Sequence, residues 1–186
     1  MPGALSLPNL LTIGRIAAIP LICLCVVLGG PFWGTIAFVL YVAAAVTDWL
    51  DGYLARKLEL GSPLGRMLDP IADKLLVGAL LVVLAFTRDL RALDLIPAIA
   101  ILMREILVSG LREHLGPKNV TVHVTPLAKW KTTVQLVALG IILLATLVPG
   151  IAFFGSIALW IAGLLTVWTG VQYYAAAWPH LTEESK

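Results

Sequence analysis

Four aspartates stand close together in the sequence, between Asp48 and Asp73, with no histidine or cysteine among them. Carboxylate oxygens are the ligands that hard divalent cations prefer, so this set favours Mg²⁺ or Mn²⁺ over zinc or copper. Together the four carboxylates, Asp48, Asp51, Asp69 and Asp73, carry a charge of about −4, which two divalent ions neutralise. A pair of such ions is a common clamp for a displacement at phosphorus. The pattern therefore predicts a two-metal site.

The spacing of these aspartates assigns them to two helix faces. Asp48 and Asp51 are three residues apart, so they share one face of a helix. Asp69 and Asp73 are four apart and also share a face. Residues 61–63, Gly-Ser-Pro, predict a tight break between the two helices. We expect an antiparallel helix hairpin in which the two acidic faces meet at similar depth.

The surrounding chain has the composition of a membrane protein. It has 186 residues, of which 60% are hydrophobic, and its mean hydropathy is +0.96. Stretches of about 20 apolar residues are long enough to cross a bilayer as helices. We predict an all-α integral membrane protein with one domain, residues 1–186. Its six spanning helices are expected at roughly 9–28, 33–58, 63–86, 95–115, 126–147 and 153–176. Carboxylates in such helices are costly and usually functional.

The basic residues predict the orientation of these helices. With the N-terminus inside, the outer loops hold only Arg88 and Arg91. The cytoplasmic ends then hold Arg15, Arg56, Lys57, Arg66, Arg112, Lys118, Lys129 and Lys131. We therefore expect both termini, and all four aspartates, on the cytoplasmic side. The net charge is only +2, and we expect no nucleic-acid partner.

The aspartates belong to a longer motif. The pattern Asp48-x2-Asp51-Gly52-x2-Ala55-Arg56-x8-Gly65-x3-Asp69-x3-Asp73 resembles the signature of the CDP-alcohol phosphotransferases at every fixed position. Members of that family move a phosphatidyl or phosphoalcohol group from a CDP-linked donor to an alcohol and release CMP. The resemblance implies a six-helix membrane fold, a homodimer and two divalent cations, Mg²⁺ or Mn²⁺. It also implies a multi-pass protein of the bacterial inner membrane whose active site faces the cytoplasm.

The resemblance further implies a role for individual residues. The four aspartates would hold the two metals, and Asp73 would also take the proton from the acceptor hydroxyl. Small residues at Gly52, Ala55 and Gly65 leave room for a large polar ligand or for close helix packing, and Arg56 supplies a cation suited to a phosphate. The residues expected to bind the donor, CDP-diacylglycerol, are Asn9, Thr12, Arg15, Gly52, Ala55, Arg56, Ser62 and Gly65.

A second group of cations lies in the fourth and fifth predicted helices. Arg104 falls about midway along its helix, where an arginine is costly unless it faces a cavity. With Arg112, Lys129 and Lys131 it could form a pocket for the phosphate of an acceptor. Alternatively, Arg112 pairs with Glu105 or Glu113 and the lysines extend to lipid head groups.

The segments that carry these cations, MREILVSGLRE and AKWKTTVQ, resemble parts of the bacterial phosphatidylglycerophosphate synthases. Those enzymes use CDP-diacylglycerol and sn-glycerol 3-phosphate. A cardiolipin synthase or a phosphatidylinositol-phosphate synthase remains an alternative within the same family. A divalent-cation transporter with an acidic pathway is an alternative from another class, but its carboxylates would be spread across the membrane rather than clustered beside Arg56.

Overall fold

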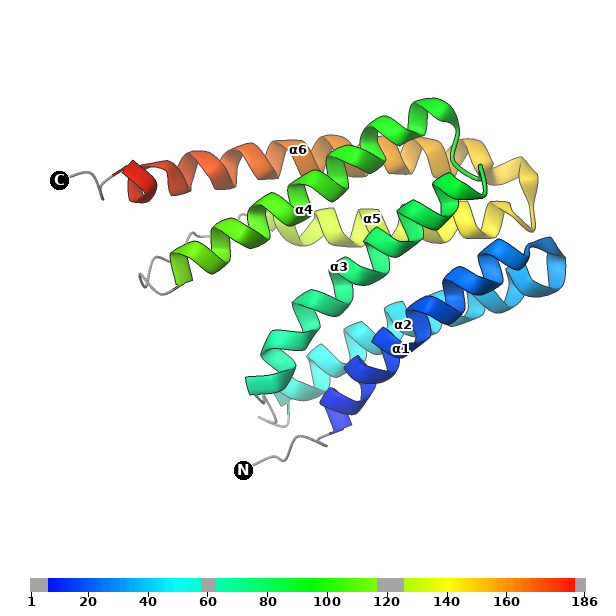
Figure 1. The fold of residues 1–186 in the computed structure, drawn as a ribbon, viewed down its shortest axis with the longest axis horizontal. Coiled ribbons are helices and arrows are strands. Elements are labelled where there is room, and N and C mark those ends of the chain that lie inside the picture. The colour runs from blue at the N-terminus through cyan, green and yellow to red at the C-terminus, as the bar shows by residue number, and fades with distance from the viewer. Residues whose placement is uncertain (1–6, 58–62, 117–125, 183–186) are drawn as a thin grey trace. The chain divides into compact units, whose positions relative to one another are not determined.

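The computed structural model describes residues 7–57, 63–116 and 126–182. The regular secondary structure of these residues is all helical, as predicted, with short turns between the helices and no strand. The elements in chain order are α1 (Leu7–Leu28), α2 (Gly30–Lys57), α3 (Pro63–Phe86), η1 (Ala92–Asp94), α4 (Leu95–Leu115), α5 (Pro126–Ala145), η3 (Pro149–Ile151) and α6 (Ala152–Thr182), labelled in part in Figure 1.

Most helix ends fall close to their predicted positions, and the ends of α3 and α4 coincide with them. The largest differences are at α2 and α6. Helix α2 begins at Gly30 rather than near residue 33, because Gly29 and Gly30 make the turn with φ values of +66° and +77°. Pro31 is then accommodated in the first turn of the helix, where its missing N–H costs nothing. Helix α6 continues to Thr182, six residues beyond the predicted end.

The chain forms two compact units. Unit 1 comprises residues 1–90 and 139–155, and unit 2 comprises residues 91–138 and 156–186. Each unit therefore combines segments that are distant in sequence. Helix α5 contributes its first part to unit 2 and its last part to unit 1.

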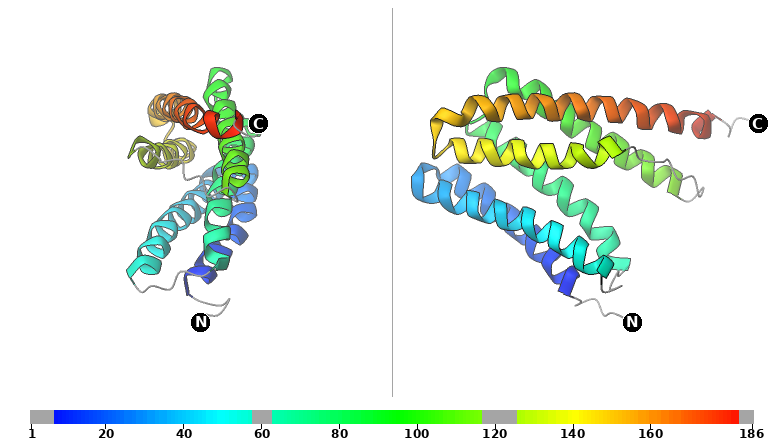
Figure 2. Two further views of the ribbon diagram at one scale, coloured as in Figure 1. Left: turned by 90° about the vertical axis from the view of Figure 1, so that its left-hand side faces the viewer. Right: turned by 180° about the vertical axis from the view of Figure 1, so that it is seen from behind.

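In unit 1, helix α1 packs against both α2 and α3. The beginning of α1, the end of α2 and the beginning of α3 lie at the same end of this unit, as both views show (Figures 1 and 2). Ile22, Leu80 and Leu84 are fully buried in its core. The packing brings the polar first half of α1 to the same end as the acidic segments of α2 and α3.

In unit 2, helices α4 and α6 run in the same direction and approach each other closely at two glycines (Figure 1). A Cβ atom at Gly163 would lie 2.6 Å from Cβ of Pro97, and one at Gly170 would lie 2.9 Å from Cγ of Arg104. Small residues at such contacts let helices pack tightly where lipid provides no hydrophobic driving force.

The start of α4 is tied to α6 by a buried carboxylate. Asp94 accepts hydrogen bonds from Ser156 Oγ at 2.6 Å and from Trp160 Nε1 at 3.2 Å. These bonds satisfy a group that would otherwise be costly to bury. Together with the glycine contacts, they set the position of α4 along α6.

Three of the described helical segments are long and apolar enough to cross a membrane, namely Asn9–Leu28, Gly30–Asp48 and Ala152–Leu181. A shorter apolar segment covers Trp130–Ala145. Large apolar side chains, such as Phe86, Ile106 and Val82, are strongly exposed on the helix surfaces. This is the pattern of a multi-pass membrane protein, whose outer surface is in contact with lipid.

Candidate active site

Polar side chains from α1 meet aspartates from α2 and α3 in unit 1. Asn9, Thr12 and Arg15 recur every three residues on α1, so they lie along one face, and all three are almost completely buried. Thr12 Oγ1 donates a hydrogen bond to Oδ1 of Asp69 at 2.7 Å. These residues were expected to line the donor cleft, and the structure places two of them directly on the proposed metal ligands.

Arg15 joins two of the aspartates. One guanidinium nitrogen, Nη1, donates to Oδ1 of Asp73 at 3.2 Å and also forms an ion pair with Oδ1 of Asp48. Because both contacts involve the same nitrogen, the two carboxylate oxygens lie within a few ångströms of each other. The acidic faces of α2 and α3 therefore do approach each other, but the Arg15 side chain of α1 lies between them and contacts both.

The exposure of these groups is uneven. The Arg15 side chain is 0% exposed, whereas those of Asp48 and Asp73 are 30% and 41% exposed. The buried guanidinium thus supports the carboxylates from the protein side, while the carboxylates remain open to a ligand. Removal of such a pair from water is costly, and the attraction offsets this cost only where hydrogen bonds satisfy the remaining donors and acceptors.

The donor set fits a hard divalent cation by its chemistry. Asp48, Asp69 and Asp73 offer only carboxylate oxygens, and two of them already share one positive group. Among the side chains that the structure describes, no three carboxylate, histidine or cysteine groups lie close enough to hold a metal ion. Asp51, the fourth expected ligand, is on α2, but its side chain lies outside the described part.

The donor-binding residues of the signature are placed only in part. Gly52, Ala55 and Arg56 are on the last two turns of α2, and their side chains, like Ser62 as a whole, are outside the described part of the chain. Gly65 is buried in the first turn of α3, one turn before Asp69.

A second polar cluster lies in unit 2 and is centred on Glu105. Its Oε1 atom accepts a hydrogen bond from Arg104 Nη1 at 3.1 Å and another from Nζ of Lys131. Two of the four predicted phosphate-binding cations therefore share one carboxylate. The alternative in which Lys131 reaches lipid head groups is wrong, because its side chain is buried against Glu105.

The other two predicted cations have different surroundings. Arg112 is exposed, and its guanidinium carbon lies 5.4 Å from the ring centroid of Tyr173, which is a cation–π contact. The alternative that pairs Arg112 with Glu105 is not what the structure has, since Glu105 instead binds Arg104 and Lys131. The side chain of Lys129 lies outside the described part.

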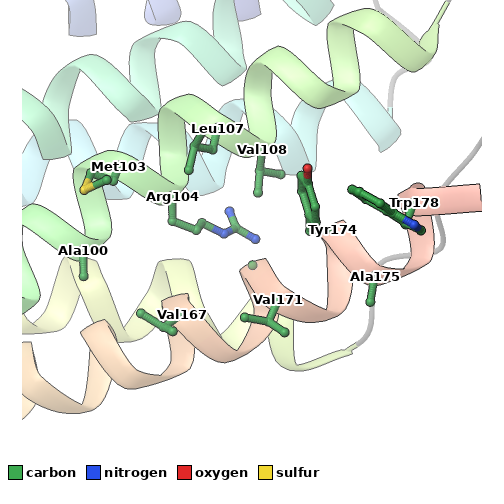
Figure 3. Close-up of a pocket in the computed structure, with 11 residues that line it drawn as sticks. Ala100, Met103, Arg104, Leu107, Val108, Val167, Val171, Tyr174, Ala175 and Trp178 are labelled. Carbon is green, nitrogen blue, oxygen red and sulfur yellow. The ribbon is translucent and has the colours of Figure 1, made fainter. Parts of the chain in front are cut away.

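Arg104 also lines a groove between α4 and α6, with a volume of about 710 Å³ (Figure 3). The groove is mainly apolar, and Figure 3 shows Arg104 extending from α4 towards Val171, with Tyr174 and Trp178 farther along. Among the described residues, none accepts a hydrogen bond from its buried Nε atom. The expectation that Arg104 faces a cavity is thus met, although the cavity is largely hydrophobic.

Glu105 was missed as a site residue by sequence reasoning, which considered it only as a partner for Arg112. One signal was available. A lysine buried in an apolar helix needs a counter-ion, and Glu105 is a carboxylate next to the arginine midway along α4.

Comparison with known proteins identifies the class to which this site belongs. Residues 5–168 match the model of the CDP-alcohol phosphatidyltransferase family, and the chain belongs to that family. The match covers most of both units and identifies a family of transferases rather than transporters.

Individual relatives narrow the comparison. The chain is 48% identical to a CDP-diacylglycerol–glycerol-3-phosphate 3-phosphatidyltransferase of Rickettsia bellii, over 92% of this chain and 94% of the relative. It is 41% identical to the chloroplastic/mitochondrial enzyme 1 of the same name from Arabidopsis thaliana, over 94% of this chain and 63% of the relative. It is also 42% identical to a CMP-forming cardiolipin synthase of Oryza sativa, over 94% of this chain and 59% of that protein.

Proposed function

We propose that this chain transfers the phosphatidyl group of CDP-diacylglycerol to sn-glycerol 3-phosphate, giving phosphatidylglycerophosphate and CMP. The observation that carries the proposal is the similarity, at 45–48% identity over nearly the full length, to several Rickettsia proteins named for this reaction. The carboxylate cluster of unit 1 and the buried cations of unit 2 support it, because the reaction needs both a site for phosphoryl-type transfer and a site for an anionic acceptor.

In the reaction, a hydroxyl oxygen of glycerol 3-phosphate attacks the phosphorus that carries diacylglycerol. The new O–P bond forms as the bond to CMP breaks, and CMP leaves with the electrons of that bond. The hydroxyl proton passes to a carboxylate of Asp73, which is 41% exposed and therefore accessible to the acceptor. Arg15 holds this carboxylate beside Asp48, and Thr12 orients Asp69.

Asp48, Asp51, Asp69 and Asp73 would hold the two divalent cations of the site, Mg²⁺ or Mn²⁺. Bound there, the cations would neutralise the charge that develops on the phosphoryl oxygens and on the leaving CMP. Donor binding is assigned to Asn9, Thr12, Arg15, Gly52, Ala55, Arg56, Ser62 and Gly65. The phosphate of the acceptor is assigned to Arg104, Arg112, Lys129 and Lys131.

We also propose that all six α-helices cross the membrane, with both termini and the aspartates on the cytoplasmic side of a bacterial inner membrane. The excess of basic residues on that side supports the orientation. Labelling a cysteine introduced near Arg88 with a membrane-impermeant reagent tests it, because that loop must react from outside. The chain would act as one domain and as a homodimer, which crosslinking in native membranes tests.

The deciding experiment is an acceptor comparison. Purified protein in detergent micelles is given CDP-diacylglycerol, Mg²⁺ and, in separate reactions, glycerol 3-phosphate, phosphatidylglycerol or inositol phosphate. We expect CMP release and a phosphatidylglycerophosphate product only with glycerol 3-phosphate. The similarity to the rice protein makes cardiolipin synthesis the second candidate. Release of CMP with phosphatidylglycerol as the sole active acceptor would establish that function instead.

A further inference from the structure

Glu105 is an acidic residue within the group of cations that we propose to bind the acceptor. A single oxygen of its carboxylate, Oε1, accepts hydrogen bonds from both Arg104 and Lys131. The side chains of Lys131, Arg104 and Glu105 are only 5%, 12% and 16% exposed. A shared oxygen fixes the ammonium and the guanidinium within a few ångströms of each other.

Two cations in this arrangement need the carboxylate. Like charges at such separations repel, and each has lost most of its hydration. Buried lysine is rarely found without a partner for the same reason. With Glu105 between them, the repulsion between the two side chains is offset and they stay close together.

The charge that remains suits a phosphate monoester. Arg112 is seven residues after Glu105 on α4, about two helical turns along the same face, so this face adds a third cation to the two that share the carboxylate. The formal charges of these three cations and one carboxylate sum to about +2, which balances the charge of roughly −2 on a phosphate monoester near neutral pH. An ammonium has three hydrogen-bond donors and a guanidinium has five, so each cation retains donors beyond the one directed at Glu105.

We propose that Glu105 is the positioning residue of the acceptor site and acts through Lys131 and Arg104. It holds the two cations at the spacing and charge that a phosphate monoester requires, and so contributes to the preference for a phosphorylated acceptor over a neutral alcohol. This inference rests on the proposed function.

Three variants of the full chain test the inference. Glu105→Gln keeps the size of the side chain and removes its charge. Glu105→Asp keeps the charge and shortens the reach. Glu113→Gln is the matched control, because Glu113 is also on α4 and is exposed. Each purified protein is assayed for CMP release while glycerol 3-phosphate and CDP-diacylglycerol are varied in turn, with inorganic phosphate as a competing ligand.

We expect Glu105→Gln to raise KM for glycerol 3-phosphate by about 10-fold or more. This rise corresponds to the loss of one charge-assisted contact between a displaced cation and the phosphate. The inhibition constant of inorganic phosphate should rise in parallel. KM for CDP-diacylglycerol should change by less than about twofold, because the donor does not use these cations. Glu105→Asp should show a smaller rise, and Glu113→Gln should match the wild type.

A double variant separates positioning from a general structural effect. If Glu105 acts through Lys131, Glu105→Gln should raise KM for glycerol 3-phosphate far less in the Lys131→Met protein than in the wild type. If the two substitutions change log KM for glycerol 3-phosphate additively, the inference is overturned. It is also overturned by a Glu105→Gln protein whose KM for glycerol 3-phosphate is unchanged or lowered, since the carboxylate would then be neutral towards the phosphate or compete with it.

If Glu105→Gln does not fold, Glu105→Asp decides alone, and a KM for glycerol 3-phosphate equal to that of the wild type overturns the inference. A wild type that releases no CMP with glycerol 3-phosphate overturns the proposed function instead. The role of Glu105 is then tested by the inhibition constant of inorganic phosphate, measured with the acceptor that the wild type uses.

Discussion

Replacement of Arg15 by alanine should destabilise unit 1 and make its stability depend more strongly on divalent cations. The change removes a fully buried guanidinium that donates to Asp73 at 3.2 Å and pairs with Asp48. Loss of one partner from a buried ion pair costs about 3–5 kcal/mol. The carboxylates are 30% and 41% exposed and can be partly rehydrated, so we take the lower value, about 3 kcal/mol.

For a chain of this size, a loss of about 3 kcal/mol lowers the unfolding temperature by roughly 6–12 °C. The assay is thermal unfolding of purified protein in detergent, with Mg²⁺ varied. Without the guanidinium, Asp48 and Asp73 repel each other, and a bound cation relieves the repulsion. Mg²⁺ should therefore raise the unfolding temperature of Arg15→Ala more than that of the wild type.

Two further variants complete this test. Arg15→Lys keeps the charge but not the planar group with several donors. Its unfolding temperature should therefore lie between those of the wild type and Arg15→Ala. Arg91→Ala, at an exposed arginine, should behave as the wild type. An Arg15→Ala protein that unfolds at the wild-type temperature, with an unchanged response to Mg²⁺, would refute the role of Arg15 in holding the two carboxylates.

Three substitutions test the proposed chemistry by CMP release. Asp69→Asn should abolish turnover while the protein stays folded in the membrane, and near-normal activity of this variant in EDTA would contradict the metal site. Asp73→Asn should lower kcat by about 10²–10⁴-fold with little change in donor binding, as expected for loss of a base; the reverse pattern would argue against that role. Arg112→Ala should raise KM for glycerol 3-phosphate by about 10-fold and weaken the preference over glycerol. An effect confined to CDP-diacylglycerol would assign Arg112 to the donor.

The helices could be predicted well because their signals are local. Proline and glycine mark the ends, and apolar stretches of membrane-spanning length occupy the space between them. The sequence-based prediction placed the start of α2 too late, because Gly29 and Gly30, both with positive φ, complete the turn by themselves. Such a conformation is allowed by glycine but is not required by it.

The candidate site was predictable to the extent that helix periodicity governs it. The spacing of Asp48, Asp69 and Asp73 assigned them to helix faces, and the structure brings Asp48 and Asp73 onto one guanidinium. The contacts made by Arg15 and Thr12 could not be predicted, because they depend on α1 lying against both α2 and α3.

The sequence by itself therefore determined the all-helical character of the chain, its family, and which residues carry charge within apolar segments. Composition and spacing along one chain are sufficient for these properties. Only the tertiary structure decided which charges pair. Lys131 and Glu105 are 26 residues apart, and their ion pair exists because α4 and α5 bring them together. The energy of a buried charge depends on its neighbours in space, which sequence distance does not specify.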